Sequence, residues 1–372
     1  MKKTLIVLIL LLLLVFAFGC TENNNLIIEY TGEEIRLSLE QKQEIGKELS
    51  KIALEKLKNK SDEINPIVSP ITDYEILCET NEQQQKKFYS FIIGENNSQN
   101  TFFSSKYGFF IKDKYEISEN IFSKKILYPK AEIYITESEN SNISQINRYF
   151  KNNTNNVIKS VFDTNNKELS PNFTVASIMQ FTGKWARQYG DKNVKDGIFT
   201  DIDGVEQKVK YLCSFENYYL ECNGGYGVMK SYRDGEFVFI ALLPPETMNV
   251  YSYIKTLDED TFTTAIINPH NIAVNTKIPK FNATSYKEAD KSVLEKLPKI
   301  SSGLTAEYYM DAVCFSVDQN GTQGVSSTTI NVIGANDEEN SKTVVLDRPF
   351  FYAVVDRDSA LPVLAGIIEH VE

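Results

Sequence analysis

The 372-residue chain is poor in the side chains on which most enzyme active sites depend. It contains only two histidines, His270 and His370, and neither has the spacing from a serine, cysteine or carboxylate that suggests a catalytic triad. The G-x-S-x-G, H-E-x-x-H and phosphate-loop motifs are absent, and no helix pattern follows the glycine turn at 224–227. Acidic pairs such as Asp258 and Asp260 are typical of a solvated face. The sequence therefore predicts a protein that is not an enzyme.

Cysteine is also scarce, and its spacing excludes two further kinds of site. The chain has five cysteines, with no C-x-x-C pair and no spacing typical of metal ligands. We therefore expect neither a metal nor another cofactor. Cys20 belongs to the N-terminal signal discussed below, which leaves Cys78, Cys213, Cys222 and Cys314. These are either buried free thiols, or Cys213 and Cys222 form a disulfide across a hairpin formed by YLCSFENYYLEC.

Positive charge is not concentrated anywhere in the chain. The formal net charge is −11 and the sequence pI is about 5.0. Such a chain is repelled by nucleic acid, so we expect no nucleic-acid partner. The composition, 42% hydrophobic and 24% charged, is that of a globular protein with material for a large core.

The first twenty residues, MKKTLIVLILLLLLVFAFGC, have the pattern of an export signal. Two lysines precede an apolar run that is short for a membrane span, and Gly19-Cys20 ends it. A cysteine after a small residue at this place resembles a bacterial-type lipoprotein processing site. We expect a signal peptide at 1–19, lipidation of Cys20, a polar tether at 20–37 and one domain at 38–372. Plain secretion and an uncleaved anchor are the alternatives.

Helical patterns predominate in the first half of the chain and strand patterns in the second. Ser38 and Gln41 form a candidate capping box for a helix with Ile45, Leu49 and Ile52 on its apolar face. We expect a strand end and a turn at 68–72, loops at 95–100 and 137–142, and two helices within 144–162. Strands are predicted at 173–181, 211–221, 236–243, 271–278, 343–356 and 361–371. This segregation predicts an α+β fold.

The segment VDQNGTQGVSSTTINVIGAN, residues 317–336, fits neither a solvated loop nor an ordinary strand. It has a single charge, and its three glycines would weaken a strand. As a strand, it would place Thr322, Gly324, Ser326 and Thr328 on one small, uncharged face, with Gln323, Val325, Ser327 and Thr329 on the other. The segment therefore suits a loop that becomes a central strand, with Gly321 as its hinge. A small-residue surface loop is the alternative.

Several motifs in order resemble those of the serpin family from about residue 38 to the end. They are IVSPIT, INRYF with TNNVI, VASIMQFTGKW, ALLPP, IPKF, NGTQGVSST, DRPFFYAVVD and LAGII. The resemblance implies three β-sheets, about nine helices and an exposed reactive-centre loop. In that family a protease cleaves the loop, the hinge inserts into the central sheet, and the protease is trapped.

The resemblance also implies roles for particular residues. The inserting hinge comprises Gly321, Thr322, Gln323, Gly324, Val325, Ser326, Ser327 and Thr328. Thr322 is expected near the surface of the uncleaved protein and against the core after insertion. Trp185, Lys280, Ser69, Ser177 and Asp311 match the breach and shutter regions, where strands separate. The bait bond is predicted between Ala335 and Asn336, within Gly334–Glu338.

Some positions depart from the family pattern. Gln319 and Asn320 stand where inhibitory relatives have two glutamates, so the ion pair with Lys280 is not expected. Ser177 and Asp311 replace the shutter asparagine and histidine, and Gly324 and Val325 interrupt a run of alanines. These departures concern the efficiency of insertion and not the fold.

The expected partner is a protease of the serine type, with cysteine proteases as a further class. No Lys or Arg occurs between Lys299 and Lys342, which excludes a trypsin-like preference, and Ala335 suits a shallow specificity pocket. If Asp337 or Glu338 is the bait, an acid-specific protease is expected instead. We expect a monomer held at a membrane by its lipid. The alternatives are a serpin-fold binding or structural lipoprotein without inhibition, and a solute-binding lipoprotein.

Overall fold

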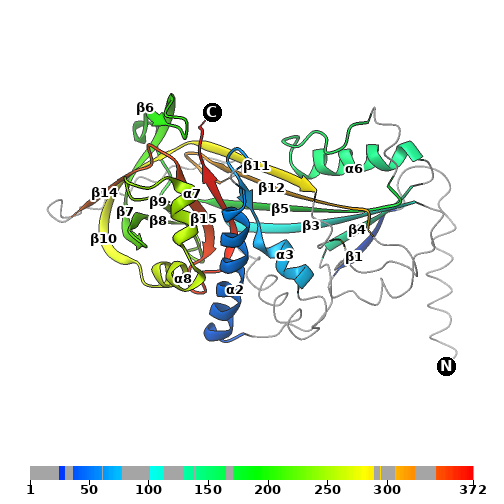
Figure 1. Cartoon of the computed structure of the whole chain (residues 1–372), viewed down its shortest axis with the longest axis horizontal. Helices are drawn as coiled ribbons and strands as arrows, with labels where there is room; N and C mark the ends of the chain where they lie inside the picture. The colour runs from blue at the N-terminus through cyan, green and yellow to red at the C-terminus, as the bar shows by residue number, and fades with distance from the viewer. Residues whose placement is uncertain are drawn as a thin grey trace.

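Two β-sheets and five α-helices make up the part of the chain that a computed structural model describes (Figure 1). The described residues are 25–29, 37–60, 62–77, 101–112, 130–136, 139–164, 171–288, 294, 306–322 and 341–371. The α+β class is confirmed. The described residues form two sheets instead of the expected three, because one long strand, described below, joins two groups of strands into a single sheet.

The first sheet has seven strands and spans the long axis of the molecule (Figure 1). Its order is β1 (Asn25–Glu29), β4 (Lys130–Thr136), β3 (Thr101–Lys112), β5 (Phe173–Lys184), β12 (Tyr308–Val317) and β11 (Phe281–Glu288), with β13 (Gly321–Thr322) paired to β5. The central strands β5 and β12 are parallel. Both are rich in apolar and β-branched residues and are largely buried, as expected for strands covered on two faces.

The second sheet has nine strands and lies toward one end of the long axis, at the left in Figure 1. Its order is β14 (Lys342–Val345), β10 (His270–Pro279), β7 (Glu206–Cys222), β8 (Gly225–Ser231), β9 (Phe237–Leu243), β15 (Phe350–Asp356), β16 (Pro362–Ile368) and β2 (Ile67–Val68), with β6 (Val194–Thr200) paired to β7. The 17-residue strand β7 pairs with β6 and β10 along one part and with β8 along another. This continuous strand joins two groups of strands into one sheet.

The helices are α2 (Leu39–Lys58), α3 (Pro70–Leu77), α6 (Glu139–Asn153), α7 (Val250–Thr256) and α8 (Glu259–Ile267), with a 3₁₀ turn η2 (Asp191–Asn193). The capping box at the start of α2 is confirmed, since Ser38 and Gln41 bond each other's backbone amides. Helix α2 packs against α3, α8 and β16, whereas α6 packs on β3, β4 and β5 (Figure 1). Of the roughly nine helices that were expected, these five lie among the described residues.

Aromatic side chains fill the space where the two sheets meet. Phe315 of the first sheet stacks on Tyr352 of the second, with ring centroids 5.5 Å apart, and Phe239 lies 6.5 Å from Phe315. Phe281 packs on Tyr352 at 5.1 Å. Such large rings dominate core energetics. The ends of β11 and β12 are thereby held on the second sheet.

Three local expectations were wrong. The turn predicted after Ser69 is helix α3, whose first residue Pro70 suits a helix N-terminus because its missing N–H needs no partner. The loop expected at 137–142 contains the start of α6. No second helix follows α6 in the described residues up to 164, because Asn155 and Asn156 adopt left-handed backbone angles that end a helix.

Two strand expectations also need correction. The strand expected at 343–356 is divided into β14 and β15, because Pro349 has no amide hydrogen to donate. Asn25–Glu29, assigned above to a polar tether, forms β1 and pairs antiparallel with β4. Its Ile and Leu content suits an edge strand.

The disulfide alternative is wrong as well. Cys213 and Cys222 lie on the same strand β7 instead of facing each other across a hairpin, and both are free thiols. Cys314 is also free and buried.

Candidate functional site

The candidate site lies where the hinge meets the end of β5. Strand β12 pairs with β5 from Tyr308 opposite Thr174 to Cys314 opposite Gln180. Beyond that point β13 pairs with β5 instead, with Gly321 opposite Lys184 and Thr322 opposite Gly183. The sheet is thus closed between β5 and β12 over most of its length, and the first two hinge residues already occupy a strand position at its end.

Thr322 is therefore not where the sequence placed it. It is 1% exposed, and its hydroxyl oxygen accepts a hydrogen bond from the Gly183 amide at 3.1 Å. The expectation of a position near the surface is wrong, because Gly321 allows this close approach. Gly321 has φ +152°, and an added Cβ would lie closer than 3.0 Å to the Gly183 carbonyl oxygen.

Three consecutive backbone carbonyls before the hinge are held by the segment that follows β5. The indole N–H of Trp185 donates to the carbonyl of Asp318 at 2.8 Å. The amide of Tyr189 donates to Gln319 at 3.1 Å, and the amide of Trp185 to Asn320 at 3.2 Å. Trp185 is fully buried and stacks on Tyr232 with ring centroids 4.7 Å apart. These contacts fix the position of the chain immediately before Gly321.

Lys280 also reaches the hinge, as the family pattern implied. Its ammonium group donates a hydrogen bond to the side-chain oxygen of Gln319. The contact between the two positions is kept, although one partner is neutral and the interaction is not an ion pair. A neutral acceptor makes a weaker bond than a carboxylate does.

A hydrogen bond bridges the two central strands at the shutter. The hydroxyl of Ser177 on β5 donates to the carboxylate of Asp311 on β12, and Tyr309 donates to Ser177 at 3.0 Å. Ser177 and Asp311 stand opposite each other in the strand pairing. Separation of β5 from β12 must break this bridge, so it favours the closed sheet.

Ser69 does not join this cluster. Its hydroxyl donates to the carbonyl of Val363 at 2.9 Å, within the second sheet. The remaining predicted site residues, Gln323, Gly324, Val325, Ser326, Ser327, Thr328, Ala335, Asn336 and Cys20, lie outside the described residues.

One important pair was missed by the sequence reasoning. Lys230 of β8 and Glu216 of β7 form an ion pair at 2.6 Å, with side chains 1% and 10% exposed. The available signal was Lys230 itself, a charged residue within the otherwise apolar strand GYGVMKS.

Side chains that could ligate a metal ion come together at one place among the described residues. The ligand atoms of Asp201, Asp203 and His370 lie within 4.8 Å of one another. However, one oxygen of Asp201 accepts the amides of Asp203 and Val205, and the other faces the His370 ring nitrogen at 3.1 Å. The Asp201 carboxylate therefore already has partners within the protein, and its turn is held without a metal.

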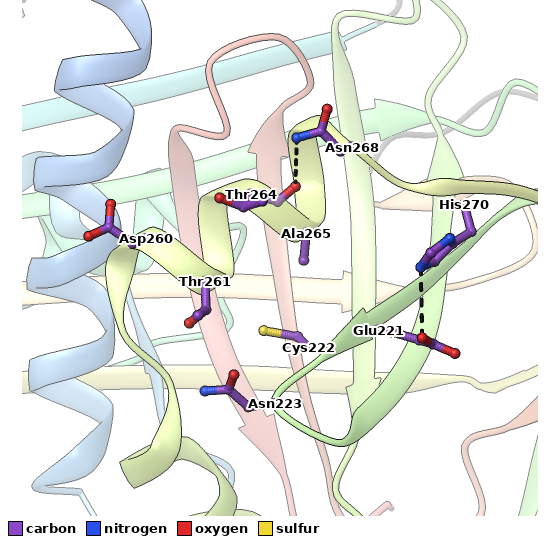
Figure 2. A pocket seen from close by; sticks show the side chains of 9 residues that line it. All are labelled: Glu221, Cys222, Asn223, Asp260, Thr261, Thr264, Ala265, Asn268 and His270. Atoms are coloured by element: carbon purple, nitrogen blue, oxygen red, sulfur yellow. Dashed lines mark hydrogen bonds and ion pairs between the residues drawn. The ribbon is translucent and has the colours of Figure 1, made fainter.

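A pocket of about 410 Å³ lies between α8 and the β7–β8 turn, away from the hinge contacts (Figure 2). Cys222 is a poor nucleophile here, because burial raises the pKa of its thiol to about 11. The His270 ring nitrogen instead faces Glu221 at 3.8 Å. The lining residues are Glu221, Cys222, Asn223, Asp260, Thr261, Thr264, Ala265, Asn268 and His270. They form no nucleophile–base pair.

Comparison with known proteins gives a consistent result. A family model described as Serpin (serine protease inhibitor) matches residues 75–371. Serpin-Z10 of Arabidopsis thaliana is 23% identical over 249 residues, which cover 60% of this chain and 64% of that protein. Human neuroserpin is 20% identical over 293 residues, covering 71% of this chain and 70% of that protein. The match thus spans less than two thirds of Serpin-Z10.

Solved structures show the same fold at low identity. The native state of the thermophilic serpin tengpin has a TM-score of 0.78 and 23% identity, and the alignment covers 92% of this chain and 97% of that one. Human thyroxine-binding globulin complexed with thyroxine has a TM-score of 0.73 and 14% identity, and the alignment covers 90% of this chain and 99% of that one. The fold thus occurs in proteins with different tasks.

Proposed function

Because the chain belongs to the serpin family, we propose that it inhibits serine proteases, with cysteine proteases as a further class, by offering a bait loop. The target cleaves the loop between Thr322 and Lys342. The hinge then inserts between β5 and β12 before the acyl-enzyme is hydrolysed. One observation carries the proposal: Gly321 and Thr322 are already paired with the end of β5, separated by two β5 residues from its last pair with β12.

The mechanism needs an uncleaved state that is kinetically trapped above the inserted one. Two features support such a trap. The bridge between Ser177 and Asp311 holds the sheet closed, and the loop ends are fixed at β13 and at β14, which pairs with β10. Cleavage releases one end of the loop. The hinge can then extend β13 residue by residue along β5. The chain needs no catalytic residues for this, since the protease supplies the chemistry.

A protease panel tests the function. We expect a complex that survives SDS with a protease of small or neutral specificity, such as an elastase-like or subtilisin-like enzyme, and none with trypsin. Mass spectrometry of the released fragment is expected to place the cut between Ala335 and Asn336. A cut outside Gly334–Glu338 would refute this bait position.

A non-inhibitory serpin-fold binding protein is the competing function. The neutral Gln319 favours this alternative, because inhibitory relatives have a charged residue there that pairs with the lysine matching Lys280. In that case every protease that cuts the loop would be released active, and no SDS-stable complex would form.

The proposal includes a location at the cell surface. The sequence of the first twenty residues supports export and lipidation of Cys20. Among the described residues, no helix has the length and apolar character needed to cross a membrane. The proposed anchor is the lipid on Cys20.

Cys20→Ala tests the anchor. We expect the wild type to partition into detergent and the variant to remain in the aqueous phase, or to accumulate unprocessed. Cys213→Ala serves as a matched control, because Cys213 is a free thiol on β7. An unchanged distribution of the Cys20 variant would contradict lipidation.

A further inference from the structure

The pair formed by Lys230 and Glu216 lies in the second sheet, yet it supports the residues that hold the hinge. The Lys230 ammonium nitrogen is 5.3 Å from the centroid of the Trp185 ring and 4.6 Å from that of Tyr189. It also donates to the backbone carbonyl of Arg187 at 3.4 Å. One buried cation thus contacts three residues of the segment 185–189.

The same segment holds the chain before Gly321. Trp185 and Tyr189 donate hydrogen bonds to the carbonyls of residues 318, 319 and 320, and the Gln188 side chain donates a further one to the carbonyl of Asn320 at 3.3 Å. A displacement of the Trp185 ring would displace the Asp318 carbonyl, and a shift of the backbone at 185–189 would displace the carbonyls of Gln319 and Asn320. The path from Lys230 to the hinge passes through only one intervening residue.

The charge of Lys230 is well supported in this position. Burial alone would lower its pKa, but Glu216 and Tyr189 outweigh burial, so that the pKa of Lys230 lies above its ordinary value. Burial raises the pKa of Tyr189, whose ring remains a neutral phenol under the cation. The Ser214 hydroxyl donates a hydrogen bond of 2.6 Å to Glu216, and its oxygen lies 3.2 Å from the Tyr189 hydroxyl.

Stability does not explain the pair well. A buried ion pair generally contributes little more than apolar side chains of the same volume, because both charges lose their hydration. What such a pair can supply is a defined geometry. A cation between two aromatic faces fixes the position of both rings.

We propose that Lys230 and Glu216 are positioning residues that fix the place of Asp318–Asn320 and thereby the register with which the hinge joins β5. The effect on insertion rests on the proposed function, whereas the positioning of Asp318–Asn320 does not. Register matters because a slip by one residue would turn Gln323 and Val325, in place of Gly324 and Ser326, toward the buried face that Thr322 occupies.

The test uses the double variant Lys230→Met/Glu216→Gln, which removes the cation without leaving an unpaired buried charge. The matched control is Lys60→Met/Glu63→Gln. It removes another Lys–Glu pair of 2.6 Å, in which the lysine side chain is 10% exposed and which lies outside the hinge contacts. Hydrogen exchange of the amides of Trp185 and Tyr189 is measured first, on the intact protein without any protease.

We expect these two amides to exchange at least roughly tenfold faster in the Lys230/Glu216 variant, the order expected from loss of a desolvated cation–aromatic contact. The fluorescence of Trp185, the single tryptophan of the chain, is expected to change as well. The control variant should match the wild type in both. Unchanged exchange at Trp185 and Tyr189 would overturn the proposal, whether or not the protein inhibits a protease.

The second readout is the partition of the acyl-enzyme, after cleavage of the bait, between trapped protease and released protease. The bait is expected to be cut at the wild-type rate, while roughly tenfold more molecules are consumed per trapped protease. A purely structural role would not separate these two quantities. Faster exchange with an unchanged partition would overturn the role in insertion. If the wild type itself traps no protease, the proposed function fails instead, and the exchange measurement still decides whether Lys230 and Glu216 position the hinge.

Discussion

Ser326→Arg is expected to convert the protein from an inhibitor into a substrate of its target protease. Thr322 is buried against β5, and a strand that continues from it with period two places Ser326 on the same face. Arginine there would bring an unpartnered charge under the sheet, at roughly 3–5 kcal/mol. Each 1.4 kcal/mol changes the ratio of insertion to hydrolysis about tenfold. The fraction of cleavage events that trap the protease should therefore fall by at least about a hundredfold.

Ser327→Arg is the matched control for that variant. Residue 327 falls on the opposite face of the same strand, so its charge can remain in solvent, and we expect trapping within a few-fold of the wild type. Both variants should be cut at the same bond and at similar rates. Equal trapping by the Ser326 and Ser327 variants would show that the hinge does not insert with this register.

Gly321→Ala should abolish the first hinge pairing. A methyl group at this position would lie within 3.0 Å of the Gly183 carbonyl oxygen and of the Lys184 Cα, and the backbone at φ +152° disfavours any side chain. The strand β13 must then leave β5. We expect a loss of about 1–3 kcal/mol in the free energy of unfolding of the intact protein, and strongly reduced trapping.

Gly204→Ala is the matched control for Gly321→Ala. It places a side chain on a positive-φ backbone but creates no steric clash. Gly204 has φ +79°, but nothing lies within 4 Å of an added Cβ. We expect it to lose only about 1–2 kcal/mol of stability from the left-handed backbone, with normal trapping. Full trapping by Gly321→Ala would contradict the view that insertion starts from the β13 pairing.

The elements that the sequence predicted well have strong local patterns. The capping box at Ser38 sets the start of α2, and the apolar runs at 173–181 and 236–243 became buried strands. Local patterns failed where tertiary pairing decides the structure. The strand β1 depends on the edge of β4, and β7 depends on partners from two groups of strands.

The candidate site shows the same division. The order of motifs assigned Trp185, Lys280, Ser177 and Asp311 only to regions of the family fold. The contacts of Trp185 and Lys280 with the segment before the hinge, and the pairing of Ser177 with Asp311, come from the structure. The buried position of Thr322 was not predicted, because it depends on the space that Gly183 and Gly321 leave between two strands. The pair Lys230–Glu216 was missed since its partners are neighbours only across β7 and β8.

Thermal unfolding of the wild type before and after cleavage of the bait loop tests the central claim most directly. A protease that cuts the loop without being trapped would produce the cleaved form. If the hinge inserts between β5 and β12, the cleaved protein gains a full central strand, and its Tm should rise far above that of the intact protein. A Tm that stays the same or falls after cleavage would contradict the proposed mechanism.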